Sequence, residues 1–219
     1  MQRKIIPLGQ YVMHTQVPLE IFNDINSIYE TRFKDLKPAN KQLVGKIKNE
    51  HSLYYSGVAS DKQTSHNFLS RYVLDWFLSV YTEYLNIKGI TPMEIRLSSI
   101  WINEMKDNEY NPIHIHQGSI FTGLSSVMIL KLPSHYGEEY SASDQPCNGK
   151  LQIIGNSSGQ FASTDYQPEL KVGDFYIFPY DMRHTVFPFN STNQVRRTLA
   201  ANCDIRYDQV RHNAARMSL

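Results

Sequence analysis

The chain has 219 residues, a hydrophobic content of 41%, a charged content of 20% and a formal net charge of +1. This composition is that of a folded protein and excludes a largely disordered chain. The near-neutral charge gives no argument for a nucleic-acid or anionic-membrane partner, so we expect neither.

Two cysteines, Cys147 and Cys203, are too few for a disulfide framework, and neither belongs to a CxxC pair. The start of the chain is basic but has no apolar stretch long enough for a signal peptide. No window approaches roughly eighteen uninterrupted apolar residues, the length that a membrane-spanning helix needs. We therefore expect a protein of the cytoplasm.

The first half of the chain carries two helical patterns. Within residues 19–29, apolar side chains recur at three- and four-residue intervals, as on one face of a helix. A stronger pattern of the same kind runs over 65–87 and predicts the main helix of the chain. Ser65 is placed to cap its start and Gly89 to end it. We expect this helix to be buried against a sheet.

After Gly89 the pattern changes to short strands separated by turn residues. The expected strands are 95–103, 113–116, 123–132, 150–154, 174–179, 184–188 and 196–205. Such a series after a helical lead indicates a sandwich or barrel packed on helices. Two polar insertions, 134–148 and 156–167, interrupt the series, and insertions of this kind commonly border sites or form lids.

No repeat or linker divides the chain, so we expect a single domain over 1–219. Residues 1–90 are predicted to give mainly helical support, and residues 91–210 to form the β core. The predicted fold class is therefore α+β.

Two histidines, His114 and His116, stand two positions apart in the expected strand 113–116. Side chains alternate along a strand, so residues at i and i+2 point to the same face. His184 follows the expected strand 174–179 and can return as a third ligand. Redox iron sites commonly hold Fe(II) on one face and leave adjacent positions open. The three histidines thus indicate a mononuclear non-haem iron site.

Arg196 opens the last expected strand, downstream of His184. A planar guanidinium binds a carboxylate through two parallel hydrogen bonds, which a lysine cannot do. Beside an iron site, Arg196 is therefore placed to anchor the carboxylate of an acidic co-substrate.

Several short pieces recur in a fixed order along the C-terminal half. They are Trp101-Ile102-Asn103, His114-Ile115-His116 with Gly118-Ser119, Thr122-Gly123-Leu124, Gly149-Lys150-Leu151, Gly173-Asp174 with Phe178-Pro179, His184-Thr185-Val186-Phe187-Pro188, and Arg196-Arg197-Thr198-Leu199-Ala200-Ala201-Asn202. Their order and spacing resemble the Fe(II)/2-oxoglutarate-dependent dioxygenases, in particular the prolyl-hydroxylase-like branch and related oxygenases of bacteria and phages. The resemblance implies a double-stranded β-helix (jelly-roll) core, with Fe(II), 2-oxoglutarate and O2 as cofactor and co-substrates. If a phage encodes the chain, the expected location is the host cytoplasm.

The resemblance also implies roles for single residues. His114 resembles the first histidine ligand of the family, and His184 its distal histidine. Arg196 resembles the basic residue that pairs with the far carboxylate of 2-oxoglutarate, and Thr198 the hydroxyl residue two positions later on the same face. Arg197 competes with Arg196, but alternation sends it to the opposite face, where we expect a solvated surface side chain.

His116 departs from the family pattern, which usually has Asp or Glu at this position. Three histidines could hold the iron while 2-oxoglutarate supplies negative charge, or His116 and Gly118 could form a site without a carboxylate, as in related halogenases in which halide fills the vacancy. A carboxylate could also come from elsewhere, with Glu104, Asp107, Glu109 and Asp181 as the nearby candidates. We favour three histidines, because His116 stands where the third ligand should be.

The reaction that the resemblance implies is hydroxylation of a C–H bond with release of succinate and CO2. The substrate would be a small molecule or a peptide, with peptidyl proline as one candidate. One rival is a cupin-type metal enzyme without 2-oxoglutarate, but residues 119–122 lack the glutamate that this reading expects. Another is a non-catalytic jelly-roll binding module whose histidines pack in the core. The sequence does not indicate an oligomeric state.

Overall fold

The computed structural model describes residues 9–39, 43–57, 64–142, 144–156, 159–190 and 193–208. The elements in chain order are β1 (Met13–Gln16), α1 (Leu19–Arg32), η1 (Phe33–Asp35), β2 (Lys37–Pro38), β3 (Asn49–Tyr55), β4 (His66–Asn67), α2 (Arg71–Ile87), β5 (Pro92–Met105), β6 (Asn111–His114), β7 (Gly123–Lys131), β8 (Leu151–Ile154), β9 (Asp165–Tyr166), β10 (Asp174–Pro179), β11 (Arg183–Val186) and β12 (Arg196–Tyr207). No helix within these described ranges is long and apolar enough to cross a membrane.

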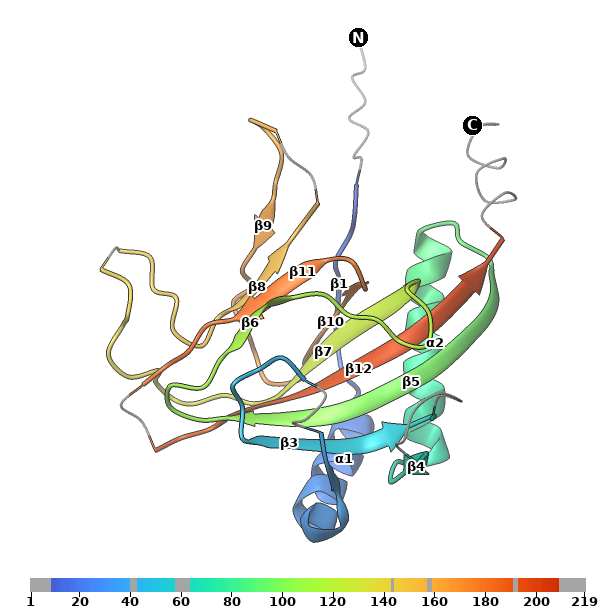
Figure 1. The fold of residues 1–219 in the computed structure, drawn as a ribbon, viewed down its shortest axis with the longest axis horizontal. Coiled ribbons are helices and arrows are strands. Elements are labelled where there is room, and N and C mark those ends of the chain that lie inside the picture. The colour runs from blue at the N-terminus through green and yellow to red at the C-terminus, as the bar shows by residue number, and fades with distance from the viewer. Residues whose placement is uncertain are drawn as a thin grey trace.

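The strands form two antiparallel sheets. The large sheet has the order β1-β10-β7-β12-β5-β3-β2, with β4 paired to β3, and the small sheet has the order β6-β11-β8-β9. Figure 1 shows the small sheet on one side of the large one and the two helices on the other. The predicted α+β class, with N-terminal helices packed on the sheet, is confirmed.

Alternation along the central strand β12 separates two buried layers. Leu199, Ala201 and Cys203 point toward the helices and join the larger apolar core, which α1 and α2 complete. A second core lies between the sheets, where Leu151 and Ile153 of β8 pack near Tyr176 and Phe178 of β10. The opposite face of β12, with Arg196, Thr198, Ala200 and Asn202, therefore turns away from the helices.

The main helix begins later than the sequence predicted. α2 starts at Arg71, and Ser70 caps it by accepting a hydrogen bond from the Val73 N–H at 3.3 Å. The prediction that Ser65 caps this helix is wrong, because His66–Asn67 pairs with β3 as strand β4. The end is as predicted: Gly89 adopts φ +66, a left-handed conformation that favours glycine.

Residues 1–90 contribute strands as well as helices. β1 pairs with β10, and β3 pairs with β5, so the N-terminal region extends the large sheet on both sides. Helical support is therefore only part of what this region provides. β3 also forms a wall of a cavity beside His114 and His116.

Candidate metal centre and active site

The three predicted histidines lie together. Their nitrogen ligand atoms all fall within 4.8 Å of one another. His114 and His184 face each other directly across the pair formed by β6 and β11. The ring centroid of His116 lies 5.0 Å from the ring centroid of His114 and 4.9 Å from that of His184. Residues far apart in the chain thus converge at one end of the small sheet.

The reason given for pairing His114 with His116 is wrong, although the pairing itself is correct. β6 ends at His114, so His116 lies in the following coil and strand alternation does not position it. Its backbone N–H instead donates to the Tyr180 carbonyl at 2.9 Å, which fixes this coil beside the end of β10. The His116 Nε2 then lies 3.0 Å from the His184 Nε2.

Backbone carbonyls set the tautomers of two of the histidines. The His114 Nδ1 donates to the Pro112 carbonyl at 2.7 Å, and the His184 Nδ1 donates to the Met182 carbonyl at 3.1 Å. A carbonyl can only accept, so each proton lies on Nδ1 and each Nε2 keeps a free lone pair. This support of the other ring nitrogen is usual for metal-binding histidines.

The histidines are held in the neutral form that binds cations. Burial and the neighbouring His114 lower the pKa of His184 to about 3. Burial, with His184 and His114 nearby, lowers the pKa of His116 well below its usual value. Two nitrogens that each lie about 2.1 Å from one ion, at a right angle, are about 3.0 Å apart. The spacing of the two Nε2 atoms therefore fits a divalent cation.

None of the candidate carboxylates joins the histidines. Within the described ranges, the three histidines form the only such group of His, Cys, Asp and Glu ligand atoms, and Asp107 is not in it. Glu104 pairs with Arg197 at 2.8 Å, on the face of the sheet that the helices cover. Glu109 accepts hydrogen bonds from two backbone N–H groups, and Asp181 accepts one from a side-chain amide. The structure therefore does not support a carboxylate from elsewhere as the third metal ligand.

Asn202 lies beside His116 and was not predicted as a site residue. Its Nδ2 is 3.3 Å from the His116 Nδ1, and its buried Oδ1 has no hydrogen-bond partner. A half-turn of the amide exchanges these two atoms within the same space. The Oδ1 then accepts from His116 Nδ1–H, and the His116 Nε2 is free for a cation. Alternation from Arg196 already placed Asn202 on this face of β12.

Arg196 is a buried cation without a full set of partners. It is 2% exposed, and neither its Nε nor its Nη2 has a hydrogen-bond partner. Burial lowers its pKa to about 10, opposed by nearby Tyr136, so it stays charged at neutral pH. A buried charge without a partner is costly. The guanidinium therefore fits a carboxylate ligand, and Thr198 is buried on the same face of β12.

Arg197 points the other way, as alternation predicted. The expectation of a solvated side chain is wrong, however. Arg197 forms ion pairs with Glu104 at 2.8 Å and with Glu30 of α1 at 2.5 Å, and its guanidinium lies 4.4 Å from the ring centre of Tyr29. It thus ties α1 to the large sheet.

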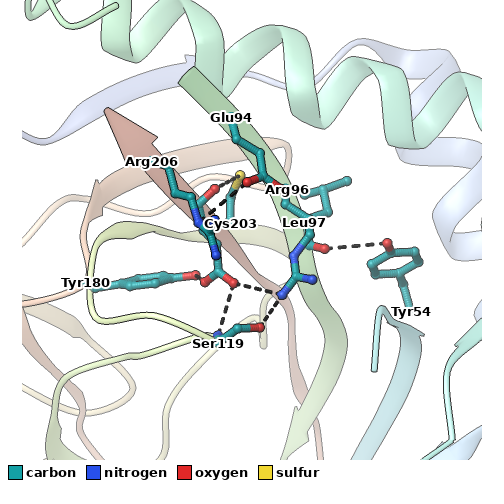
Figure 2. A network of polar contacts seen from close by, with 9 residues as sticks. Tyr54, Glu94, Arg96, Leu97, Ser119, Tyr180, Cys203 and Arg206 are labelled. Atoms are coloured by element: carbon teal, nitrogen blue, oxygen red, sulfur yellow. Dashed lines mark hydrogen bonds and ion pairs between the residues drawn. The ribbon is translucent and has the colours of Figure 1, made fainter. Parts of the chain in front are cut away.

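The coil that carries His116 is held down by the carboxylate of Asp204. The donors to this carboxylate are the Ser119 N–H at 3.0 Å, Arg96 at 3.3 Å and the Tyr180 hydroxyl at 3.2 Å (Figure 2). A Cβ at position 118 would overlap the Asp204 Oδ1, so Gly118 is needed for this close approach. Position 118 faces Asp204 and not the histidines, which argues against the halogenase-like alternative.

A cavity of about 630 Å³ opens beside the histidines. His114, His116 and Asn202 line one side of it, and residues of β3 and β5 line another. Among the described residues, none from the insertions 134–148 and 156–167 lines this cavity. The expectation that these insertions border the site is not supported for this cavity, because the N-terminal strand β3 occupies its wall instead.

Residues 99–202 match the model of a protein family described as "Putative 2OG-Fe(II) oxygenase". The matched stretch holds all three histidines, Arg196 and Thr198. This part of the chain is thus similar to a family of oxygenases, and the similarity implies Fe(II) and 2-oxoglutarate as cofactor and co-substrate. A comparison with curated protein sequences gave no match.

Solved structures with the same fold include two prolyl hydroxylases and a protein named AviO1. A Pseudomonas putida prolyl-4-hydroxylase is 14% identical, with 91% of this chain and 93% of that chain covered and a TM-score of 0.50. A Trichoplax adhaerens prolyl hydroxylase in complex with a hypoxia inducible factor peptide fragment is 9% identical (94% and 86% covered, TM-score 0.52). AviO1 from Streptomyces viridochromogenes Tue57 is 11% identical (92% and 91% covered, TM-score 0.53). These likenesses show the fold alone, and they confirm the predicted double-stranded β-helix.

Proposed function

We propose that the protein hydroxylates a C–H bond of a substrate held in the cavity, with release of succinate and CO2. The observation that carries the proposal is the close approach of neutral histidine nitrogens, 3.0 Å between the Nε2 atoms of His116 and His184. When bound, Fe(II) and 2-oxoglutarate supply the oxidising chemistry with O2. The cupin-type and binding-module readings account for neither the family match nor the unpartnered guanidinium of Arg196.

His114, His116 and His184 would hold the metal through their Nε2 atoms. Three neutral histidines bring no negative charge, so bound 2-oxoglutarate would supply the charge that a protein carboxylate usually gives. Arg196 would bind the far carboxylate, and burial strengthens such an ion pair by excluding water. The Thr198 hydroxyl would donate a further hydrogen bond to the same carboxylate.

The substrate is a small molecule or a peptide that enters the 630 Å³ cavity. Peptidyl proline is one candidate, because prolyl hydroxylases share the fold, and the Trichoplax adhaerens enzyme was solved with a peptide. A shared fold does not fix a substrate. We also propose that residues 1–219 act as one oxygenase unit, since β1 and β3 complete the sheet that carries the site.

Anaerobic titration tests this function. Addition of Fe(II) and 2-oxoglutarate to the wild-type protein should produce a weak visible metal-to-ligand absorption band, and O2 should then yield succinate. Arg196→Gln should require at least about tenfold more 2-oxoglutarate for the same band, since a charge-assisted contact is lost. The matched control is Arg206→Gln, an exposed arginine on the same strand. A wild-type protein that gives no band at saturating iron would contradict the proposal.

A further inference from the structure

Glu50 is a buried carboxylate on the wall of the same cavity. It is 1% exposed, and its Oε2 has no hydrogen-bond partner. On β3, Glu50 pairs with Asn103 of β5, and two positions further Ser52 pairs with Trp101. Residues at i and i+2 of a strand point to the same face of the sheet, so Glu50 and Ser52 lie on the same face as Trp101. The Trp101 ring lies 5.9 Å from the ring of His116, which connects the carboxylate to the metal centre.

The surroundings of Glu50 disfavour its charge. Burial, followed by repulsion from Glu109, raises the pKa of Glu50 to about 7. Among the described residues that line the cavity there is no lysine or arginine, and the histidines are kept neutral. A buried carboxylate without a cation is costly unless it takes up a proton. A ligand with a positive charge would remove this cost by pairing with Glu50.

We infer that the cavity binds a substrate with a basic nitrogen, an amine or a guanidinium, on an aliphatic stem, and that Glu50 holds this nitrogen. The inference rests on the proposed function and deepens it, because it names the substrate class of the same site. Ala39, Leu43 and Trp101 line the cavity and form an apolar cluster with Ala200 against which methylene groups can pack.

The distance between Glu50 and the histidine side of the cavity fits a substrate with an extended aliphatic stem. Glu50 pairs with Asn103 of β5, and Asn103 pairs with Thr198 of β12, so Glu50 stands two strand spacings, about 10 Å, from Thr198 and is further offset along the strand from Asn202. A side chain such as that of lysine or arginine would place its nitrogen at Glu50 and an inner C–H bond toward the histidines. Peptidyl proline has no basic nitrogen to offer Glu50 and becomes the weaker candidate.

The first test compares matched probes on the wild-type full-length protein by titration calorimetry. The probes are Nα-acetyl-lysine amide, Nα-acetyl-arginine amide and the neutral Nα-acetyl-norleucine amide. We expect at least about tenfold tighter binding of a basic probe than of the norleucine probe, as for a hydrogen bond between charged groups. Equal affinities, or no binding of either basic probe at millimolar concentration, would overturn the inference.

The second test changes Glu50. Glu50→Gln keeps the shape and removes the charge, so the preference for the basic probes should fall to within about twofold. Glu50→Asp keeps the charge and should keep part of the preference. Glu83→Gln, an exposed change on α2, serves as the matched control. A Glu50→Gln protein with the full preference would overturn the inference, and if this variant does not fold, Glu50→Asp and the wild-type comparison decide.

Failure of this inference is distinct from failure of the proposed function. The absorption band with Fe(II) and 2-oxoglutarate needs no amine. A band without any preference for basic probes would overturn the role of Glu50 and leave the oxygenase proposal standing. A preference without a band would support Glu50 as the binding residue and contradict the oxygenase proposal.

Discussion

Hydrogen bonds to three ring nitrogens decide whether the histidines can bind a cation. Backbone carbonyls hold two of the Nδ1 atoms, and those two bonds involve no other side chain. His116 depends instead on a side chain, the amide of Asn202. His116, which we propose as a ligand in place of the usual carboxylate, is therefore also the histidine whose orientation a single substitution can disturb.

Asn202→Ala tests this dependence. Loss of the amide should weaken binding of Fe(II) or Co(II) by about 10- to 100-fold, the range seen when supporting partners of metal-binding histidines are removed. Anaerobic calorimetry measures the affinity directly and needs no turnover. Asn86→Ala, an exposed change on α2, is the control. An Asn202→Ala protein that binds the cation as tightly as the wild type would show that His116 needs no such support.

The residues of the site differ in how far the sequence could reveal them. The spacing of His114, His116 and His184 within a familiar series of motifs was enough to predict that their side chains lie together. Strand alternation places Asn202 on the same face of β12 as Arg196, so its position could be predicted from the sequence. Its contact with His116 could not be predicted. Glu50 gave no local signal, because only the pairing of β3 with β5 brings it to the cavity.

At the level of elements, the sequence was most informative where one face of a strand is buried. The seven expected strands form with small shifts of their ends, from β5 to β12. β1 and β3 were missed because their hydrophobic pattern is weak and their partners lie far along the chain. The start of α2 was misplaced for a related reason, since the short β4 takes its residues into the sheet.

The coil between β6 and β7 is an element whose position depends on one glycine. Gly118→Ala should displace the Asp204 carboxylate and the coil with it, because the added Cβ overlaps the Asp204 Oδ1. We expect a loss of about 1–3 kcal/mol in stability, from broken hydrogen bonds to a charged group, and weaker cation binding. Gly155→Ala is the control, since a Cβ there meets only the Thr164 carbonyl at 3.4 Å.

Denaturant unfolding and cation titration of the two glycine variants check this prediction. Wild-type stability and cation affinity in Gly118→Ala would mean that Asp204 does not position the His116 coil.

At the scale of the whole molecule, the buried Glu50 makes global stability depend on pH. Its folded pKa of about 7 lies above the usual 4.5, so the folded state binds more protons between these values. The favourable contribution is complete below about pH 4.5 and is lost as the pH rises through 7. Glu109, the other carboxylate that acts on Glu50, contributes to this loss by repulsion.

Glu50→Gln should therefore stabilise the metal-free protein at pH 8 relative to pH 4.5, by roughly 1–3 kcal/mol. Urea unfolding of the wild type and the variant at the two pH values measures the difference, with Glu83→Gln as the control. An equal effect of Glu50→Gln at both pH values would mean that the carboxyl titrates normally.

The central place of β12 in the large sheet has a consequence for synthesis of the chain. β12 is the last described strand, yet it lies between β7 and β5. A ribosome releases residues in order, at about 5–20 per second, so the earlier strands emerge seconds before the strand that joins them. During this interval β5 and β7 each expose an unpaired edge. Arg196 and Asn202, which lie on β12, have not yet been synthesised. Because Asn202 supports His116, the proposed cation site can form only after β12 has been synthesised, and a stop before residue 196 would leave unpaired strand edges that favour aggregation.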